Sequence, residues 1–241
     1  MKQNTMIYTM NMTISQTSKV YHSSYYARHA LFEKGSWLEQ CEPEVLNIVN
    51  NNLSDDKPIK ILDLGCGVGK NAIPISRILK QRATITCVDI LPTAITTLKK
   101  NAQKFSVSSA ITGIVSPIES YPIPTSSYDL ILANSVLMFL DTRDAVKSVL
   151  EDMIHGTKND GINYISLSCD VSERDMTTQK IEPNITELPF SFEETRTWLQ
   201  TIYIGWKCIL ENGTPYSEHY VRDGKELLWT TTFLSVAYQK K

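Results

Sequence analysis

Residues 61–70 read ILDLGCGVGK and place Gly65, Gly67 and Gly69 directly after a short apolar run. Glycine has no Cβ, so this backbone can turn tightly and approach a bound molecule to van der Waals contact. A glycine-rich turn after the first strand of an α/β sheet is typical of a nucleotide site. The GxGxG spacing differs from the dinucleotide fingerprint GxGxxG. A P-loop is excluded, because it would end in Gly-Lys-Ser/Thr and this segment does not.

Two carboxylates accompany the glycines. Asp63, just before the loop, would repel a phosphate but would attract an ammonium group. It therefore favours a ligand such as S-adenosylmethionine, which carries an α-amino group and a sulfonium and has no phosphate. Asp89 ends the next predicted strand, 24 residues after Gly65, where a carboxylate can accept hydrogen bonds from ribose hydroxyls. Asp89 would suit NAD equally well, so Asp63 and the glycine spacing distinguish the two ligands.

The elements around these residues alternate between strands and helices. Strands are predicted over short β-branched or apolar runs, namely residues 59–64, 83–90, 109–116, 128–133 and 162–168. Amphipathic helices are predicted between them, over residues 71–79, 92–105 and 141–155. This alternation predicts an α/β fold with a mostly parallel sheet covered on both faces.

The two ends of the chain depart from this rhythm. Residues 1–18 are polar and are predicted to form a loose tail, and residues 19–56 a helical lid whose apolar face includes Trp37, Leu38, Val45, Leu46 and Val49. Residues 57–241 form the predicted binding domain. Within it, residues 169–189 are predicted to be a long polar loop and residues 192–199 a helix. Two β-rich runs, residues 206–210 and 227–238, are predicted to form a hairpin through Asp223-Gly224.

The bulk composition narrows the function classes. The chain has 241 residues and a formal net charge of −2, without the clustered basic residues of a nucleic-acid-binding protein. Its five cysteines show neither metal-ligand spacing nor paired spacing, so no metal site is expected. With no apolar run of membrane-spanning length, we expect a cytoplasmic protein that acts on a small-molecule substrate, as a monomer or a homodimer.

Three segments carry a resemblance to a known superfamily. LDLGCGVGKN, CVDI and YDLILANSVLMFL resemble, in order, the nucleotide-site segments of class I S-adenosylmethionine-dependent methyltransferases, over roughly residues 59–168. Within that superfamily the chain looks most like the tellurite-resistance methyltransferase (TehB) type, because of SVLMFLDTRD, GINYISLS, LPFSF and a C-terminal hairpin ending in Lys-Lys. The resemblance implies a Rossmann-like fold with a seven-stranded sheet whose last strand is antiparallel.

The resemblance also implies a set of cofactor contacts. Asp63 would face the cofactor's amino group, Asp89 the ribose and Ile90 the adenine. Ser116, Pro117 and Ile118 stand where the superfamily usually has an acid for the adenine amino group, with Glu119 close by. The remaining implied contacts come from the loop, the lid and the end of the fourth strand: Tyr26, Gly65, Cys66, Gly67, Gly69, Asn71, Asn134 and Ser135.

For catalysis, His219 matches a histidine near the active site of the TehB type. The arginine that follows it in that type is Tyr220 here, and Arg222 is a possible substitute from a shifted register. The acceptor is either an oxyanion of the tellurite or selenite kind or a small organic molecule methylated at oxygen, nitrogen or sulfur. Two other functions stay open, an NAD(P)-dependent oxidoreductase and a non-catalytic S-adenosylmethionine-binding protein.

Overall fold

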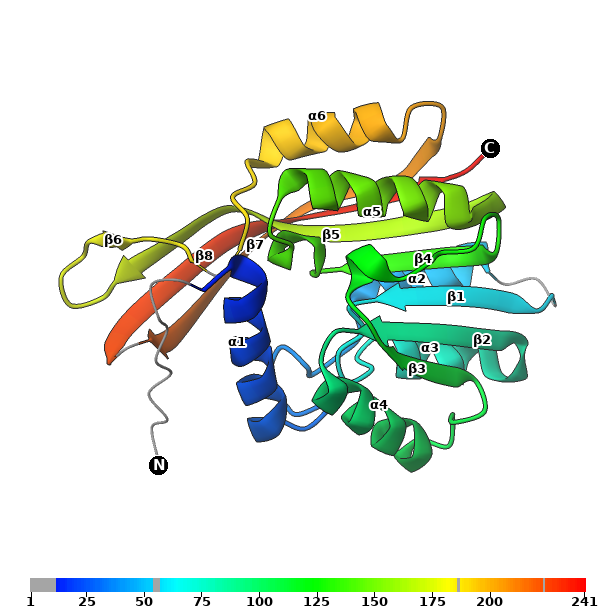
Figure 1. Cartoon of the computed structure of the whole chain (residues 1–241), viewed down its shortest axis with the longest axis horizontal. Helices are drawn as coiled ribbons and strands as arrows, with labels where there is room; N and C mark the ends of the chain where they lie inside the picture. Colours follow the sequence, from blue (N-terminus) through cyan, green and yellow to red (C-terminus); the bar gives the residue numbers. More distant parts are fainter. Residues whose placement is uncertain (1–11, 54–56, 186, 223) are drawn as a thin grey trace.

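Buried strands at the centre of the molecule organise the fold. In the computed structural model, which describes residues 12–53, 57–185, 187–222 and 224–241, one sheet has the strand order β3-β2-β1-β4-β5-β8-β7, and the short β6 pairs with β5 (Figure 1). The strands are β1 (Ile59–Leu64), β2 (Ala83–Asp89), β3 (Ile111–Val115), β4 (Tyr128–Asn134), β5 (Thr157–Asp175), β6 (Ile181–Glu182), β7 (Lys207–Arg222) and β8 (Lys225–Gln239). This arrangement confirms the predicted α/β class with antiparallel C-terminal strands.

Strands β1 to β5 pair in parallel. Ile61, Leu62 and Leu64 in β1 are fully buried because helices cover both faces of this half of the sheet. The carboxyl ends of β1, β2 and β4 therefore meet at one edge of the sheet. This edge carries the glycine loop, Asp89 and Asn134.

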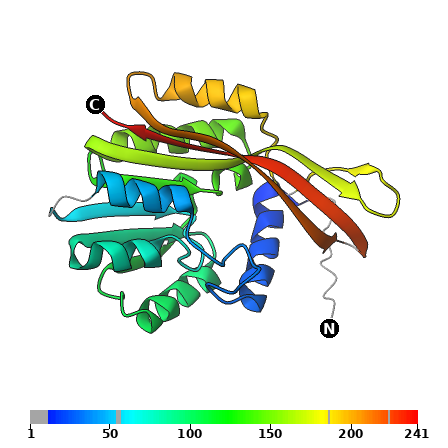
Figure 2. The same ribbon diagram turned by 180° about the vertical axis from the view of Figure 1, so that it is seen from behind.

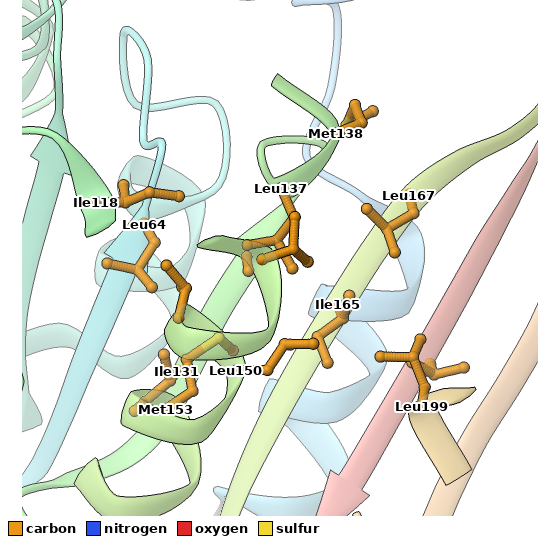
Figure 3. Close-up of a cluster of buried hydrophobic side chains, with 14 of the residues drawn as sticks. Leu64, Ile118, Ile131, Leu137, Met138, Leu150, Met153, Ile165, Leu167 and Leu199 are labelled. Atoms are coloured by element: carbon orange, nitrogen blue, oxygen red, sulfur yellow. The ribbon is translucent and has the colours of Figure 1, made fainter. Parts of the chain in front are cut away.

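Two helical layers enclose the sheet. On one face lie α5 (Arg143–Gly156) and α6 (Phe192–Ile202), whose apolar side chains join the cluster that includes Leu64, Ile131 and Ile165 (Figure 3). On the other face lie α2 (Pro43–Asn52), α3 (Ala72–Leu79) and α4 (Pro92–Lys104) (Figure 2). Three short 3-10 turns complete the connections, η1 (Lys80–Arg82), η2 (Ile118–Ser120) and η3 (Leu137–Phe139). No helix within the described ranges is long and apolar enough to span a bilayer.

The antiparallel strands extend well past the parallel half of the sheet (Figure 1). The prediction of a loop over residues 169–189 is wrong for its first part, because β5 continues to Asp175 and pairs there with β8, from Ser172 opposite Thr230 to Asp175 opposite Leu227. Its polar side chains hid the strand from the sequence pattern. The hairpin is also longer than predicted, since β7 runs to Arg222.

An N-terminal cap lies over the glycine-loop edge. The predicted loose tail is wrong where the structure describes it, because α1 (Ile14–Arg28) begins at Ile14, with Thr13 and Gln16 forming a reciprocal capping box. Residues 1–11 of that tail lie outside the described residues. Trp37 and Leu38 lie in turns between α1 and α2 rather than on the predicted helix. The Trp37 ring stacks on Tyr25 at 4.5 Å, which ties these turns to α1.

Candidate functional site

The glycine loop is held open by left-handed backbone conformations. Gly65, Gly67 and Gly69 have φ angles of +70°, +52° and +96°, a region that side chains with a Cβ rarely enter. The N–H groups of Gly65 and Cys66 both donate to the Val88 carbonyl, at 2.8 and 3.1 Å. The loop is thereby fixed to the end of β2.

Asp89 connects the loop to the next helix. One carboxylate oxygen accepts the Gly67 N–H at 2.9 Å, and the other accepts the Leu91 N–H at 2.9 Å. Burial raises the pKa of Asp89, and the two N–H donors oppose that shift. The side chain thus shapes the loop before any ligand binds.

Asp63 is a deeply buried acid beside the glycine loop. It is only 2% exposed, and its Oδ2 has no hydrogen-bond partner among the described residues. Burial and, secondarily, the nearby Asp89 raise the pKa of Asp63 to about 7. A buried carboxyl without a partner is costly unless a ligand supplies one, so Asp63 fits an ammonium or hydroxyl donor.

A cavity of about 730 Å³ opens in front of these groups, within the roughly 300–1,000 Å³ range of small-molecule sites. Its walls come from the glycine loop, α1, the turns before α2 and the cavity face of β5, β7 and β8. The predicted residues that line it are Tyr26, Asp63, Gly65, Cys66, Gly67, Asn71, Asn134 and Ser135. Gly69 lies behind the loop instead, against Leu98 and Ile73.

A smaller pocket of about 90 Å³ adjoins the cavity beside Asp89. Ile90 and Ile118, two of the predicted adenine contacts, line it together with Glu119. Ser116 and Pro117 do not line it. The Ser116 hydroxyl donates to the Pro117 carbonyl at 3.0 Å, and the Ser116 N–H donates to the Asp89 carbonyl at 3.0 Å. Glu119, which the sequence places next to the expected position, is an acid that lines this pocket in addition to Asp89.

Three predicted loop and lid residues have structural partners of their own. The Asn71 side-chain oxygen accepts the Glu42 N–H at 3.2 Å and so anchors the turns before α2. Cys66 is buried and the pKa of its thiol is raised well above the usual value, chiefly by burial, which disfavours a reactive thiolate. The Tyr26 hydroxyl lies directly over Gly67.

The structure does not bring His219 to the cavity. Every second side chain along this part of β7 lines the cavity, namely Thr214, Tyr216, Glu218, Tyr220 and Arg222. His219 lies between two of them, so its side chain points to the opposite face of the strand, where it is exposed. Its proposed catalytic role is therefore unsupported by position. Arg222, the possible substitute, does line the cavity.

Replacing His219 by alanine should leave turnover within about twofold of wild type, because the side chain faces away from the cavity. Stability should change by no more than about 0.5 kcal/mol, as expected for an exposed surface position. Single-turnover methyl transfer together with a denaturant melt tests both statements. A large loss of turnover with unchanged cofactor affinity would contradict this geometry.

Sequence reasoning missed most of the cavity wall opposite the glycine loop. The acidic and aromatic side chains that were missed include Glu173, Glu187, Glu218, Trp229 and Phe233. The alternation of side chains along residues 214–222 was the sequence signal available for this wall. Which of the two sets of alternating side chains faces the cavity, however, depends on the pairing of β7 with β8.

The strand order, the antiparallel last strands and the glycine loop followed by an acid at the end of β2 define a Rossmann-like protein with the class I methyltransferase fold. The chain belongs to the TehB family, since a model of that family, described as tellurite resistance protein TehB, matches residues 25–221. The predicted resemblance is thus confirmed.

Individual relatives agree with this family. The chain is 29% identical over 155 residues to a protein of Haemophilus influenzae named probable S-adenosyl-L-methionine-dependent methyltransferase TehB, covering 64% of this chain and 48% of the relative. The chain thus spans about half the length of the curated relatives it matches.

Solved structures show the same fold. TehB from Haemophilus influenzae superposes with a TM-score of 0.62 at 22% identity, covering 93% of this chain and 67% of that one. The N-methyltransferase NodS from Bradyrhizobium japonicum, solved with S-adenosyl-L-homocysteine, superposes with a TM-score of 0.55 at 14% identity, covering 93% and 98%.

Proposed function

We propose that this protein is an S-adenosylmethionine-dependent methyltransferase that acts on a small molecule. The observation that carries the proposal is the buried Asp63 carboxyl, whose Oδ2 has no hydrogen-bond partner among the described residues, beside a glycine loop that opens into a cavity of about 730 Å³. A pyrophosphate next to Asp63 would be repelled, whereas the cofactor's α-ammonium group would be attracted. This charge preference disfavours an NAD(P)-dependent oxidoreductase.

Each part of the cofactor has a complementary group in the chain. The glycine-loop backbone suits the methionine part, and Asp63 suits its ammonium group. Asp89 suits the ribose hydroxyls, and the smaller pocket with Ile90, Ile118 and Glu119 suits the adenine. Within the family, the name methyltransferase given to the Haemophilus influenzae relative supports this reading.

Methyl transfer requires no covalent bond between the protein and the reactants. The bound cofactor would supply a methyl group already activated by a positively charged sulfur. The chain has to hold the acceptor in line with that methyl and to exclude water. The α1 cap and the β7–β8 hairpin, whose side chains line the cavity opposite the glycine loop, are the elements suited to both tasks.

Calorimetric titration with S-adenosylhomocysteine and with NADH tests the cofactor, and transfer of a labelled methyl group tests the reaction. We expect binding of S-adenosylhomocysteine, no binding of NADH, and transfer to at least one small acceptor. Preferential NADH binding would favour the oxidoreductase. Cofactor binding without turnover for any acceptor would favour the non-catalytic protein.

Cofactor affinity should depend on pH through Asp63. Because the pKa of Asp63 is raised to about 7, this carboxyl is protonated in the free protein below pH 7, whereas an ammonium ligand favours its ionised form. Binding therefore releases a proton at low pH, and affinity should fall by up to about tenfold per pH unit below pH 7 and level off above it. Asp63→Asn should remove most of this slope, leaving the smaller contribution of Asp89. An unchanged slope in calorimetric titrations of this variant would contradict the assignment.

A further inference from the structure

Three strands place an aromatic ring between two carboxylates on the cavity face of the antiparallel strands. Trp229 of β8 lies opposite Glu173 of β5 and opposite Glu218 of β7, and all three line the cavity. The rings of Tyr216 and Phe233 lie next to Trp229, with centroids 6.0 and 6.1 Å away. Aromatic faces attract cations, and the Glu218 carboxylate, which forms no ion pair with a lysine or arginine among the described residues, adds to the same preference.

The two basic side chains of the cavity are already neutralised. Lys70 pairs with Glu42 at 2.5 Å. Arg222 pairs with Glu173 at 2.6 Å, and the Tyr220 hydroxyl donates to the same carboxylate at 2.7 Å. The remaining nitrogen, Nη1, is buried and has no hydrogen-bond partner among the described residues. An anionic acceptor would find both positive charges matched.

Glu187 and Glu218 also line the cavity, and each accepts a hydrogen bond from a hydroxyl group. Glu187 is 8% exposed and accepts a hydrogen bond from the Ser168 hydroxyl. Burial raises the pKa of Glu187 to about 7. Glu218 is half-buried, and burial raises its pKa against the effect of a hydrogen bond from Tyr216. The pKa of about 7 suits Glu187 to exchange a proton with a ligand.

From these observations we propose that the methyl acceptor is a small organic amine with an apolar body, bound as an ammonium ion between Trp229, Glu218 and Glu187. This inference rests on the proposed methyl transfer and gives its substrate class. Glu187 takes one proton from the ammonium, which frees the nitrogen lone pair. The nitrogen then forms a bond to the methyl carbon as the carbon–sulfur bond breaks and its electron pair stays on sulfur. The products are an N-methylammonium ion and S-adenosylhomocysteine.

Matched probes that differ only in their head group test this substrate class. The intact protein is first titrated with S-adenosylhomocysteine, and the saturated protein is then titrated with two series: 2-phenylethylamine, 2-phenylethanol and phenylacetate; and hexylamine, hexanol and hexanoate. Sodium tellurite is titrated in parallel. We expect an amine to bind at least about tenfold more tightly than its own alcohol and carboxylate, and to accept label from S-adenosylmethionine.

Isosteric variants show which carboxylates bind the amine. Glu187→Gln and Glu218→Gln should each weaken amine binding at least about fivefold while leaving the affinities for the alcohols and for S-adenosylhomocysteine within about twofold. Glu226→Gln is the matched control, because Glu226 is exposed on β8 and does not line the cavity. Thermal melts confirm that each variant is folded.

The outcomes separate the two proposals. Absence of S-adenosylhomocysteine binding would remove the proposed function itself. If S-adenosylhomocysteine binds but every amine is matched or exceeded by its alcohol, its carboxylate or tellurite, only the amine assignment is overturned. Amine binding that is insensitive to both glutamine variants would overturn it as well.

Discussion

Replacing Gly65 by alanine should lower the free energy of unfolding by about 2–4 kcal/mol and weaken cofactor binding at least about tenfold. Gly65 has a φ of +70°, and a Cβ built there would lie 2.6 Å from the Cβ of Val136. That atom is attached to the backbone, so it cannot swing away as the end of a flexible side chain can. Relief of the clash requires the loop or the turn after β4 to move, and both line the cavity.

Gly205→Ala is the matched control for this prediction. Gly205 also has a left-handed backbone, with φ +86°, but a Cβ there would meet nothing within 4 Å. Only the conformational strain remains, so the loss of stability should be about 1–2 kcal/mol, without a change in cofactor affinity. Denaturant melts and calorimetry on both variants measure the difference. Equal losses in the two variants would show that the close approach to Val136 is unimportant.

Replacing Asp89 by alanine should weaken cofactor binding by about 1.5–3 kcal/mol, the cost of removing a charged hydrogen-bond partner. The structure adds a second effect, because Gly67 and Leu91 both donate backbone N–H bonds to this carboxylate. Without it, a buried donor of the loop loses its acceptor, and stability should fall by about 1–3 kcal/mol as well. Calorimetry with S-adenosylhomocysteine and a denaturant melt separate these effects.

Asp129→Asn provides the control at the opposite end of the sheet. Asp129 accepts the Lys60 N–H at 2.8 Å and pairs with Lys158 at 2.7 Å, away from the glycine loop. Its replacement should lower stability without changing cofactor affinity. Unchanged cofactor affinity in Asp89→Ala would argue against the ribose role, whatever happens to its stability.

The central site could be predicted from the sequence because its signals are local. Gly65, Gly67 and Gly69 indicate a backbone with left-handed conformations. Asp63 and Asp89 lie at the carboxyl ends of two buried strands, close to these glycines. The buried runs of β1, β2 and β4 are contiguous in sequence, so their burial is visible without knowing their partners. The cap was predicted only over residues 19–56, because the capping-box spacing of Thr13 and Gln16 was missed and the start of α1 was assigned to the tail.

The acceptor side depended on the tertiary structure. Residues 169–175 read as a polar loop, yet they form a strand because β8 supplies hydrogen-bond partners from a distant part of the chain. Pairing also decides that Glu218 faces the cavity while its neighbour His219 faces outward, since adjacent strand residues point to opposite sides. The sequence alone therefore determined the fold class and the edge of the sheet that carries the glycine loop, because the backbone conformation there requires particular residues at particular positions. Which side chains of β5, β7 and β8 line the cavity was decided by long-range strand register, because a shift of one residue exchanges the two faces.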